Sequence, residues 1–261
     1  MKGKNWREFE PQRRPRRKRK GGLLRKLCRG LILFMIGYVG FLAYDALSKP
    51  YTVALDAGHG GMDTGATGLL NEVELTERTV SELQGLLEED GRFRVVLSRN
   101  AGEGTTVTER NHKLRRRHPD LLLSVHGNAS DNSSANGFEC FPSPPGYANH
   151  EESLAFATLL AEEMQNAGAA LRGTGTAGVR YGYYDESGNK VLRDSSDTTV
   201  YSYDTFGMLK NMRCPAVLAE QCFLTNATDV ERFGTEEGCK RAAEAYYRAI
   251  CGYLEGADSR G

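Results

Sequence analysis

The residues Tyr51-Thr52-Val53-Ala54-Leu55-Asp56-Ala57-Gly58-His59-Gly60-Gly61 join an apolar run to a glycine-rich turn that carries a histidine. The run is typical of a buried β-strand, and the glycines after it indicate a tight turn. Flanking glycines leave the imidazole of His59 uncovered, which suits a metal ligand at the mouth of a strand. A histidine in such a turn is also a common loop residue, so the rest of the chain has to decide between the two roles.

Strand-like and helix-like patterns alternate along the chain after this turn. The predicted strands cover residues 51–56, 93–97, 121–125, 137–141 and 215–219. The predicted helices cover residues 72–89, 107–117, 151–164 and 236–254. The alternation predicts an α/β fold, a single three-layer domain with a largely parallel twisted sheet flanked by helices. Residues 181–184 and 190–193 flank Ser187-Gly188-Asn189, which predicts an exposed hairpin, with an irregular surface loop as the alternative.

The N-terminal part of the chain is strongly basic. Residues 1–30 hold thirteen Lys or Arg and two glutamates, whereas the whole chain of 261 residues has 34 basic and 34 acidic residues. An uncharged segment, 31–44, follows the basic run. Because this apolar segment lies next to the basic run, the sequence argues against nucleic acid as a partner and predicts a single N-terminal transmembrane helix.

The positive-inside rule then sets the topology. We expect a basic cytoplasmic segment over residues 1–29, a transmembrane anchor over residues 30–47 and an outer domain over residues 48–261. This places a single-pass protein in the cell membrane with its N-terminus in the cytoplasm. Cleavage near Ser48 would instead release the outer domain, and a buried core helix is a further alternative.

The six cysteines form no CxxC pair, which argues against a zinc ribbon or a thioredoxin-like motif. Five of them lie in the outer domain, where small buried side chains are their expected role. One disulfide remains open from the sequence alone.

Four chemically capable side chains fall at one edge of the predicted sheet. His59, His126 and Glu220 each follow a predicted strand, and Glu72 begins the first predicted helix. Ligands of open α/β sheets gather at the carboxyl ends of the strands. Two histidines and a carboxylate suit a zinc ion with an open fourth position, and a further carboxylate can act as its base. Glu72 could also have a purely structural role, because a carboxylate at a helix N-terminus is favourable. His126 and Glu220 follow apolar strands, where a polar side chain needs a partner.

Four motifs together resemble the zinc-dependent N-acetylmuramoyl-L-alanine amidases of bacterial cell walls. They are residues 56–61 (DAGHGG), 72–75 (EVEL), 124–129 (SVHGNA) and 215–220 (PAVLAE), the last followed by 223–226 (FLTN). The resemblance covers about residues 52–254. It implies that His59, Glu72 and His126 bind Zn²⁺, that Glu220 is the catalytic carboxylate, and that residues 48–261 form a zinc amidase domain.

The resemblance also implies a reaction and a set of partners. The expected reaction is hydrolysis of the amide bond between N-acetylmuramic acid and L-alanine in peptidoglycan, carried out by a monomer. A non-catalytic peptidoglycan-binding module and a zinc peptidase or deacylase acting on another amide remain alternatives. The chain departs from the family pattern at Val73, Glu74, Gly127 and Gln221-Cys222. None of these departures removes a proposed ligand or the base.

Overall fold

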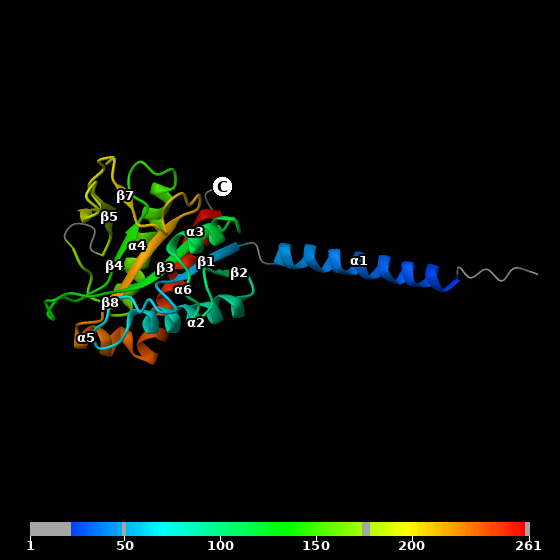
Figure 1. Cartoon of the computed structure of the whole chain (residues 1–261), viewed down its shortest axis with the longest axis horizontal. Coiled ribbons are helices and arrows are strands. Elements are labelled where there is room, and N and C mark those ends of the chain that lie inside the picture. The colour runs from blue at the N-terminus through cyan, green and yellow to red at the C-terminus, as the bar shows by residue number, and fades with distance from the viewer. Residues whose placement is uncertain (1–21, 49–50, 174–177, 259–261) are drawn as a thin grey trace, which may run out of the picture. The chain divides into compact units, whose positions relative to one another are not determined.

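A computed structural model describes residues 22–48, 51–173 and 178–258 of the chain (Figure 1). The chain separates into two compact units, Met1–Leu47 and Ser48–Gly261. Each unit is described by itself.

The described residues of the first unit form the helix α1 (Gly22–Ser48), in which the side chains of Leu31, Phe34 and Phe41 are exposed. Within the described part of the chain, no helix combines the length and apolarity needed to cross a membrane. The anchor predicted over residues 30–47, and the membrane location derived from it, are therefore wrong. The reason lies in the charge distribution, because the uncharged run between Arg29 and Asp45 falls short of the roughly 20 apolar residues of a span. Most of the basic segment 1–29 lies outside the described residues.

The second unit is built on a five-stranded sheet with the order β2-β1-β3-β8-β4. Its strands are β1 (Tyr51–Ala57), β2 (Phe93–Leu97), β3 (Leu121–Asn128), β4 (Glu139–Pro142) and β8 (Ala216–Phe223). Strands β2, β1, β3 and β8 pair in parallel, whereas β4 pairs antiparallel with β8 at the edge. The predicted α/β fold with a largely parallel sheet is confirmed. All parallel strands end at one edge, and that edge carries the site described below.

Three long helices pack on one face of the sheet: α2 (Glu72–Asp90), α4 (His150–Asn166) and α6 (Glu236–Asp258). Helix α2 forms because Leu75, Thr79, Leu83 and Leu87 recur at helical spacing and are all buried. Gly91 ends the helix in the left-handed conformation. Together with apolar residues of the strands, the three helices form the larger hydrophobic core.

The opposite face of the sheet is covered by α3 (Val107–Arg115) and by residues 206–214. Helix α3 begins at a capping box, in which Thr106 and Glu109 bond reciprocally. Its buried Leu114 packs in a smaller core with Leu122 and Leu218. The sheet is thus sandwiched between two apolar layers, which accounts for the uninterrupted apolar runs in its strands.

A second, antiparallel sheet has the order β6-β5-β7. It consists of β5 (Arg180–Tyr184), β6 (Lys190–Asp194) and β7 (Asp204–Thr205). Strands β5 and β6 form the predicted hairpin, and Gly188 takes a φ of 80° in its turn. A bridge between Cys140 and Val179 connects this sheet to β4. After β8, the short α5 (Ala227–Asp229) and the π-helical segment η1 (Val230–Gly234) lead into α6.

All six cysteines are free thiols. Cys140, Cys214, Cys222 and Cys239 are buried, as small apolar side chains would be. Burial raises the pKa of the Cys140 and Cys222 thiols, so both are poorly reactive.

Candidate metal centre

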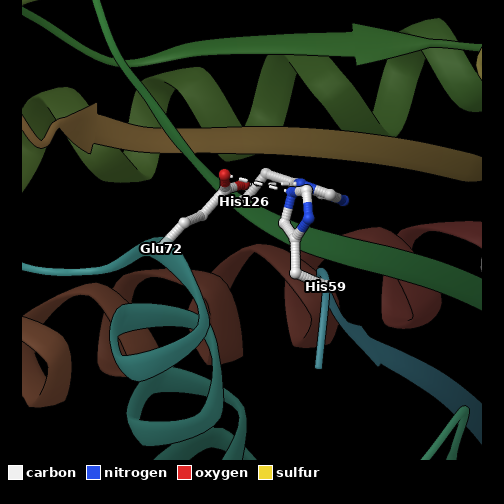
Figure 2. Close-up of side chains that lie close together, drawn as sticks. All are labelled: His59, Glu72 and His126. Carbon is white, nitrogen blue, oxygen red and sulfur yellow. Dashed lines mark hydrogen bonds and ion pairs between the residues drawn. The ribbon is translucent and has the colours of Figure 1, made fainter. Parts of the chain in front are cut away.

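Three of the four predicted site residues meet at the carboxyl edge of the sheet. His59 follows β1, Glu72 opens α2 and His126 lies near the end of β3. One ligand atom from each lies within 4.8 Å of the others. Figure 2 shows both imidazoles facing the carboxylate. His59 Nε2 lies 3.0 Å from Glu72 Oε2, and His126 Nδ1 lies 2.8 Å from Glu72 Oε1. Two nitrogens and one oxygen therefore converge on a common point.

The turn that carries His59 has an unusual backbone. His59, Gly60 and Gly61 have φ values of 62°, 132° and 61°. A left-handed histidine costs free energy, so the surrounding structure must hold the turn in place. Gly60 has to be glycine, because a Cβ there would lie 2.5 Å from the carbonyl oxygen of Glu103 and 2.6 Å from Arg99 Nε.

Two buried arginines fix this turn through hydrogen bonds to its backbone carbonyls. Arg99 donates from Nε to the Ala57 carbonyl and from Nη2 to the Gly58 carbonyl, each at 3.0 Å. Arg110 donates from Nη1 to the same Ala57 carbonyl at 3.1 Å and to Asp56 Oδ1 at 2.6 Å. The two carbonyls just before His59 are thereby fixed by charge-assisted hydrogen bonds, which are the stronger kind.

Two further glycines make room for the ligand side chains. A Cβ on Gly58 would lie 2.5 to 2.8 Å from three ring atoms of His126. A Cβ on Gly65 would lie 2.5 Å from Glu72 Oε2 and 2.6 Å from His59 Cδ2, and the φ of Gly65 is 65°. The glycines therefore form a cradle in which the three ligand groups can approach one another.

Aspartates near the turn have different roles. Asp63 Oδ2 accepts a hydrogen bond from His59 Nδ1 at 2.9 Å, which orients the ring so that Nε2 faces Glu72. A carboxylate on the second nitrogen is the usual way of orienting a metal-binding histidine. Asp56 is fully buried and bonds to Ser98, Ser124 and Arg110 instead. Of the two, Asp63 is the one that touches a candidate ligand.

Glu72 is the electrostatic centre of the group. Its Oε2 accepts from the Ala66 amide at 2.8 Å and its Oε1 from the Gly127 amide at 3.1 Å. Burial favours the neutral form of Glu72, but hydrogen bonds from His126 and His59 outweigh it and hold its pKa well below the usual range. The hydrogen bond between Glu72 and His59 raises the pKa of His59 to about 9, although burial acts in the opposite direction. An ionised carboxylate thus faces two imidazoles, which is a suitable environment for a cation.

Glu220 lies beside this group within β8, which continues to Phe223, and it pairs in register with His126. It is 9% exposed, and burial raises its pKa. Its Oε2 has no hydrogen-bond partner among the described residues, and Lys190 Nζ from β6 lies 4.0 Å from its Oε1. A buried carboxylate oxygen with nothing to bind is costly unless a bound group uses it.

These observations fit a divalent metal ion. The donor set of two imidazole nitrogens and a carboxylate oxygen is one that Zn²⁺ favours in catalytic sites. The glycine cradle and the unpartnered oxygen of Glu220 leave the site shaped and polarised for a bound group.

Sequence reasoning missed several neighbours of the site. Glu139, on β4, pairs in register with Glu220 and accepts hydrogen bonds from Asn128 and Arg180. The sequence could have indicated Glu139 as a site residue, because Glu139, like Glu220, is an acidic residue inside an apolar strand. No local pattern distinguishes the buried Arg99 and Arg110 from solvated arginines.

Comparison with known proteins agrees with this geometry. A family model described as N-acetylmuramoyl-L-alanine amidase matches residues 53–252. The chain belongs to this amidase family. The four site residues lie inside the matched region, as do all residues of the parallel strands except Tyr51 and Thr52.

Individual relatives of the amidase family support the same assignment. The probable amidase AmiB of Haemophilus influenzae is 26% identical over 246 residues, which cover 86% of this chain and 57% of that protein. The amidase LytC of Bacillus subtilis is 30% identical over 203 residues, covering 77% of this chain and 35% of LytC. The chain thus spans about half or less of the length of these two relatives.

Solved structures show a likeness in three dimensions. Cwp6 from Clostridium difficile superposes with a TM-score of 0.64 at 25% identity, covering 78% of this chain and 29% of that one. The catalytic domain of the amidase CwlV from Bacillus (Paenibacillus) polymyxa has a TM-score of 0.63 at 24% identity, with 78% and 98% covered. The likeness to CwlV shows a shared fold.

Proposed function

We propose that this chain hydrolyses the amide bond between N-acetylmuramic acid and L-alanine in peptidoglycan and so releases the stem peptide from the glycan. The single observation that carries the proposal is the meeting of His59, Glu72 and His126 beside the unpartnered Glu220, in a chain of the amidase family. We assign Zn²⁺ to the three ligands. When bound, zinc acidifies a water molecule and polarises the carbonyl group under attack.

Residues of the chain would then carry out the proton transfers of the reaction. Glu220 would accept the proton of the attacking water, and its buried Oε2, which has no hydrogen-bond partner among the described residues, supports this role. The same carboxyl group would return this proton to the departing amine of L-alanine. Lys190 lies close enough to Glu220 to favour its charged form against the effect of burial.

Product analysis tests the proposal. Peptidoglycan is digested with the full chain, with added zinc or with a chelator, and the products are separated and weighed by mass spectrometry. Intact glycan and free stem peptides that begin with L-alanine are expected, and only with zinc. Cleavage within the peptide would make the protein a peptidase, and unchanged material that still binds the protein would make it a binding module.

A variant pair ties the activity to Glu220. Glu220→Gln should retain zinc but lose turnover by about a hundredfold or more, as is usual when a general base is removed. Glu74→Gln is the matched control, because Glu74 is on the exposed side of α2 and pairs with Arg78. Full activity of Glu220→Gln would remove Glu220 from the mechanism. The monomeric state remains a prediction, to be checked by light scattering on the same samples.

A further inference from the structure

A cationic cavity lies at the edge of the sheet opposite the metal centre. It has a volume of about 460 Å³ and lies between the end of α3 and residues 211–214, just before β8. Pro119 lines it and immediately precedes β3, whereas His126 lies near the other end of that strand. At about 3.3 Å per residue, Leu121 and His126 are roughly 17 Å apart. The cavity is therefore a separate place from the proposed active site.

Basic side chains dominate the cavity wall. Five of its nine lining residues are Arg or His, and none is acidic: His112, Arg115, Arg116, His118 and Arg213. All five are exposed. The acidic residue next to the wall, Asp120, accepts a hydrogen bond from the Thr52 amide at 2.7 Å through its Oδ2. The cavity thus presents cationic groups to solvent without an anionic group among them.

The surrounding unit makes this cluster unusual. Thirteen of the 34 basic and three of the 34 acidic residues precede Ser48, so residues 48–261 carry 21 basic and 31 acidic residues. Elsewhere in this unit Arg78, Arg99 and Arg110 each pair with a carboxylate. Within the described ranges, no ion pair involves Arg115, Arg116 or Arg213. Like charges gathered without counter-charges repel one another, and this repulsion would be relieved by an anion.

Buried hydrogen bonds hold the two walls of the cavity together. Asn111, in α3, is buried and donates from Nδ2 to the carbonyls of Gly207, Met208 and Lys210 at 3.1, 2.9 and 3.1 Å. Asn149 donates from Nδ2 to the carbonyl of Cys214 at 2.6 Å. The backbone that carries the arginines is therefore fixed before any ligand arrives, which lowers the entropic cost of binding.

We propose that this cavity binds a phosphate-type oxyanion, with Arg115, Arg116 and Arg213 as its principal ligands. A guanidinium group offers two parallel donors that match the oxygens of a phosphate. A phosphate group carries close to two negative charges and three acceptor oxygens, so it can engage several guanidinium groups at once. A single carboxylate has two acceptor oxygens and one negative charge, so it would leave most of the positive charge of the cluster uncompensated.

Thermal unfolding with inorganic pyrophosphate as the probe tests this proposal at constant ionic strength on the full chain. Pyrophosphate should raise the Tm of the native protein by several degrees, because binding to the folded state stabilises it. The triple variant Arg115→Gln, Arg116→Gln, Arg213→Gln should start from an equal or higher Tm, since repulsion is removed, and should show no such rise. Calorimetric titration should give an affinity at least about tenfold weaker for this variant.

The matched control is Lys240→Gln, which removes one exposed positive charge from α6 and should keep the full pyrophosphate response. Glutarate, a dicarboxylate, serves as the second probe. The proposal is overturned if the native protein shows no response to pyrophosphate, if the triple variant responds like the native one, or if glutarate binds equally well. None of these outcomes bears on the proposed amidase activity, because the probe, the residues and the readout are all separate from the metal centre.

Discussion

Glycine 58 is the residue on which the placement of His126 most directly depends. Any Cβ added at Gly58 would overlap three atoms of the His126 ring. Gly58→Ala should therefore displace the imidazole and weaken zinc binding by about 10- to 100-fold, the usual effect of disturbing the groups around a metal ligand. Competition with a chromophoric chelator measures this affinity.

A helical glycine supplies the control for that substitution. Gly85, in α2, has open space where a Cβ would go. Gly85→Ala should leave zinc affinity unchanged and increase the free energy of unfolding by about 0.5–1 kcal/mol. Equal zinc affinity in the Gly58 and Gly85 variants would show that His126 tolerates the added methyl group and that the cradle has no such role.

We expect Arg99 to position His59, because it bonds to the carbonyls of the turn and not to the candidate metal ligands. Arg99→Lys keeps the positive charge but cannot reach both the Ala57 and Gly58 carbonyls with a rigid fork. We expect a loss of about 1–3 kcal/mol in unfolding free energy from the unpaired buried carbonyls, together with weaker zinc binding. Arg78→Lys, on the surface of α2, should change neither quantity. Zinc affinity that stays native in Arg99→Lys despite the loss of stability would restrict Arg99 to a structural role.

At the scale of elements, a polar cluster fastens the end of α2 to α6. Asp90 receives hydrogen bonds from Arg92 Nε at 2.5 Å and Nη2 at 2.6 Å, and from the hydroxyl of Tyr247. The hydrogen bond from Arg92 is the main reason why the pKa of Asp90 falls to about 2 from its usual 3.8. Without these partners a carboxylate at a helix C-terminus would be unfavourable.

This cluster predicts a pH dependence of stability. A carboxyl group whose pKa is lowered by folding stabilises the folded state above its unfolded pKa and loses that contribution as the pH falls through its folded pKa. Asp90→Asn should lower the unfolding free energy by about 1 kcal/mol at neutral pH. The difference from the native protein should shrink as the pH falls from about 4 to about 2. Denaturant titrations at a series of pH values measure it, and a difference independent of pH would assign the effect to packing.

Most elements of the fold were predictable because their signals are local. The apolar runs at Val53, Leu122 and Val217 marked buried strands, and the spacing of Leu75, Leu83 and Leu87 marked α2. The antiparallel direction of β4 was not predictable, since pairing direction depends on a partner elsewhere in the chain. The hydrogen bonds of Arg99 and Arg110 to the Ala57 carbonyl likewise span 42 and 53 residues.

The candidate site was predictable to a similar extent and for a similar reason. Histidine and glutamate at strand ends are visible in sequence, and the structure brings His59, Glu72 and His126 together as the sheet topology requires. The N-terminal apolar run was misjudged, because the anchor predicted over residues 30–47 counted Asp45 and the two residues after it toward the span.

At the scale of the whole molecule, the candidate metal site joins three separate parts of the second unit. Since His59, Glu72 and His126 come from a turn, a helix and a strand, zinc should stabilise the folded state well beyond the site itself. Saturating zinc should raise the Tm by about 5–10 °C over the chelated protein in scanning calorimetry. Glu72→Gln should abolish the zinc response, whereas Glu74→Gln should preserve it. An unchanged Tm after chelation would argue against a metal that links these elements.

The parallel pairing of β1 with β3 has a consequence for the order of events in folding. Val53 pairs with Leu121 and Ala57 with Val125, so about 68 residues separate strands that must be adjacent before His59 and His126 can meet. Contacts between such distant parts of a chain form late and slowly. A nascent or unfolded chain therefore offers zinc only scattered single ligands, and metal uptake should follow the kinetics of sheet assembly. Binding of the metal ion would then report that the sheet has formed and that the candidate site is complete.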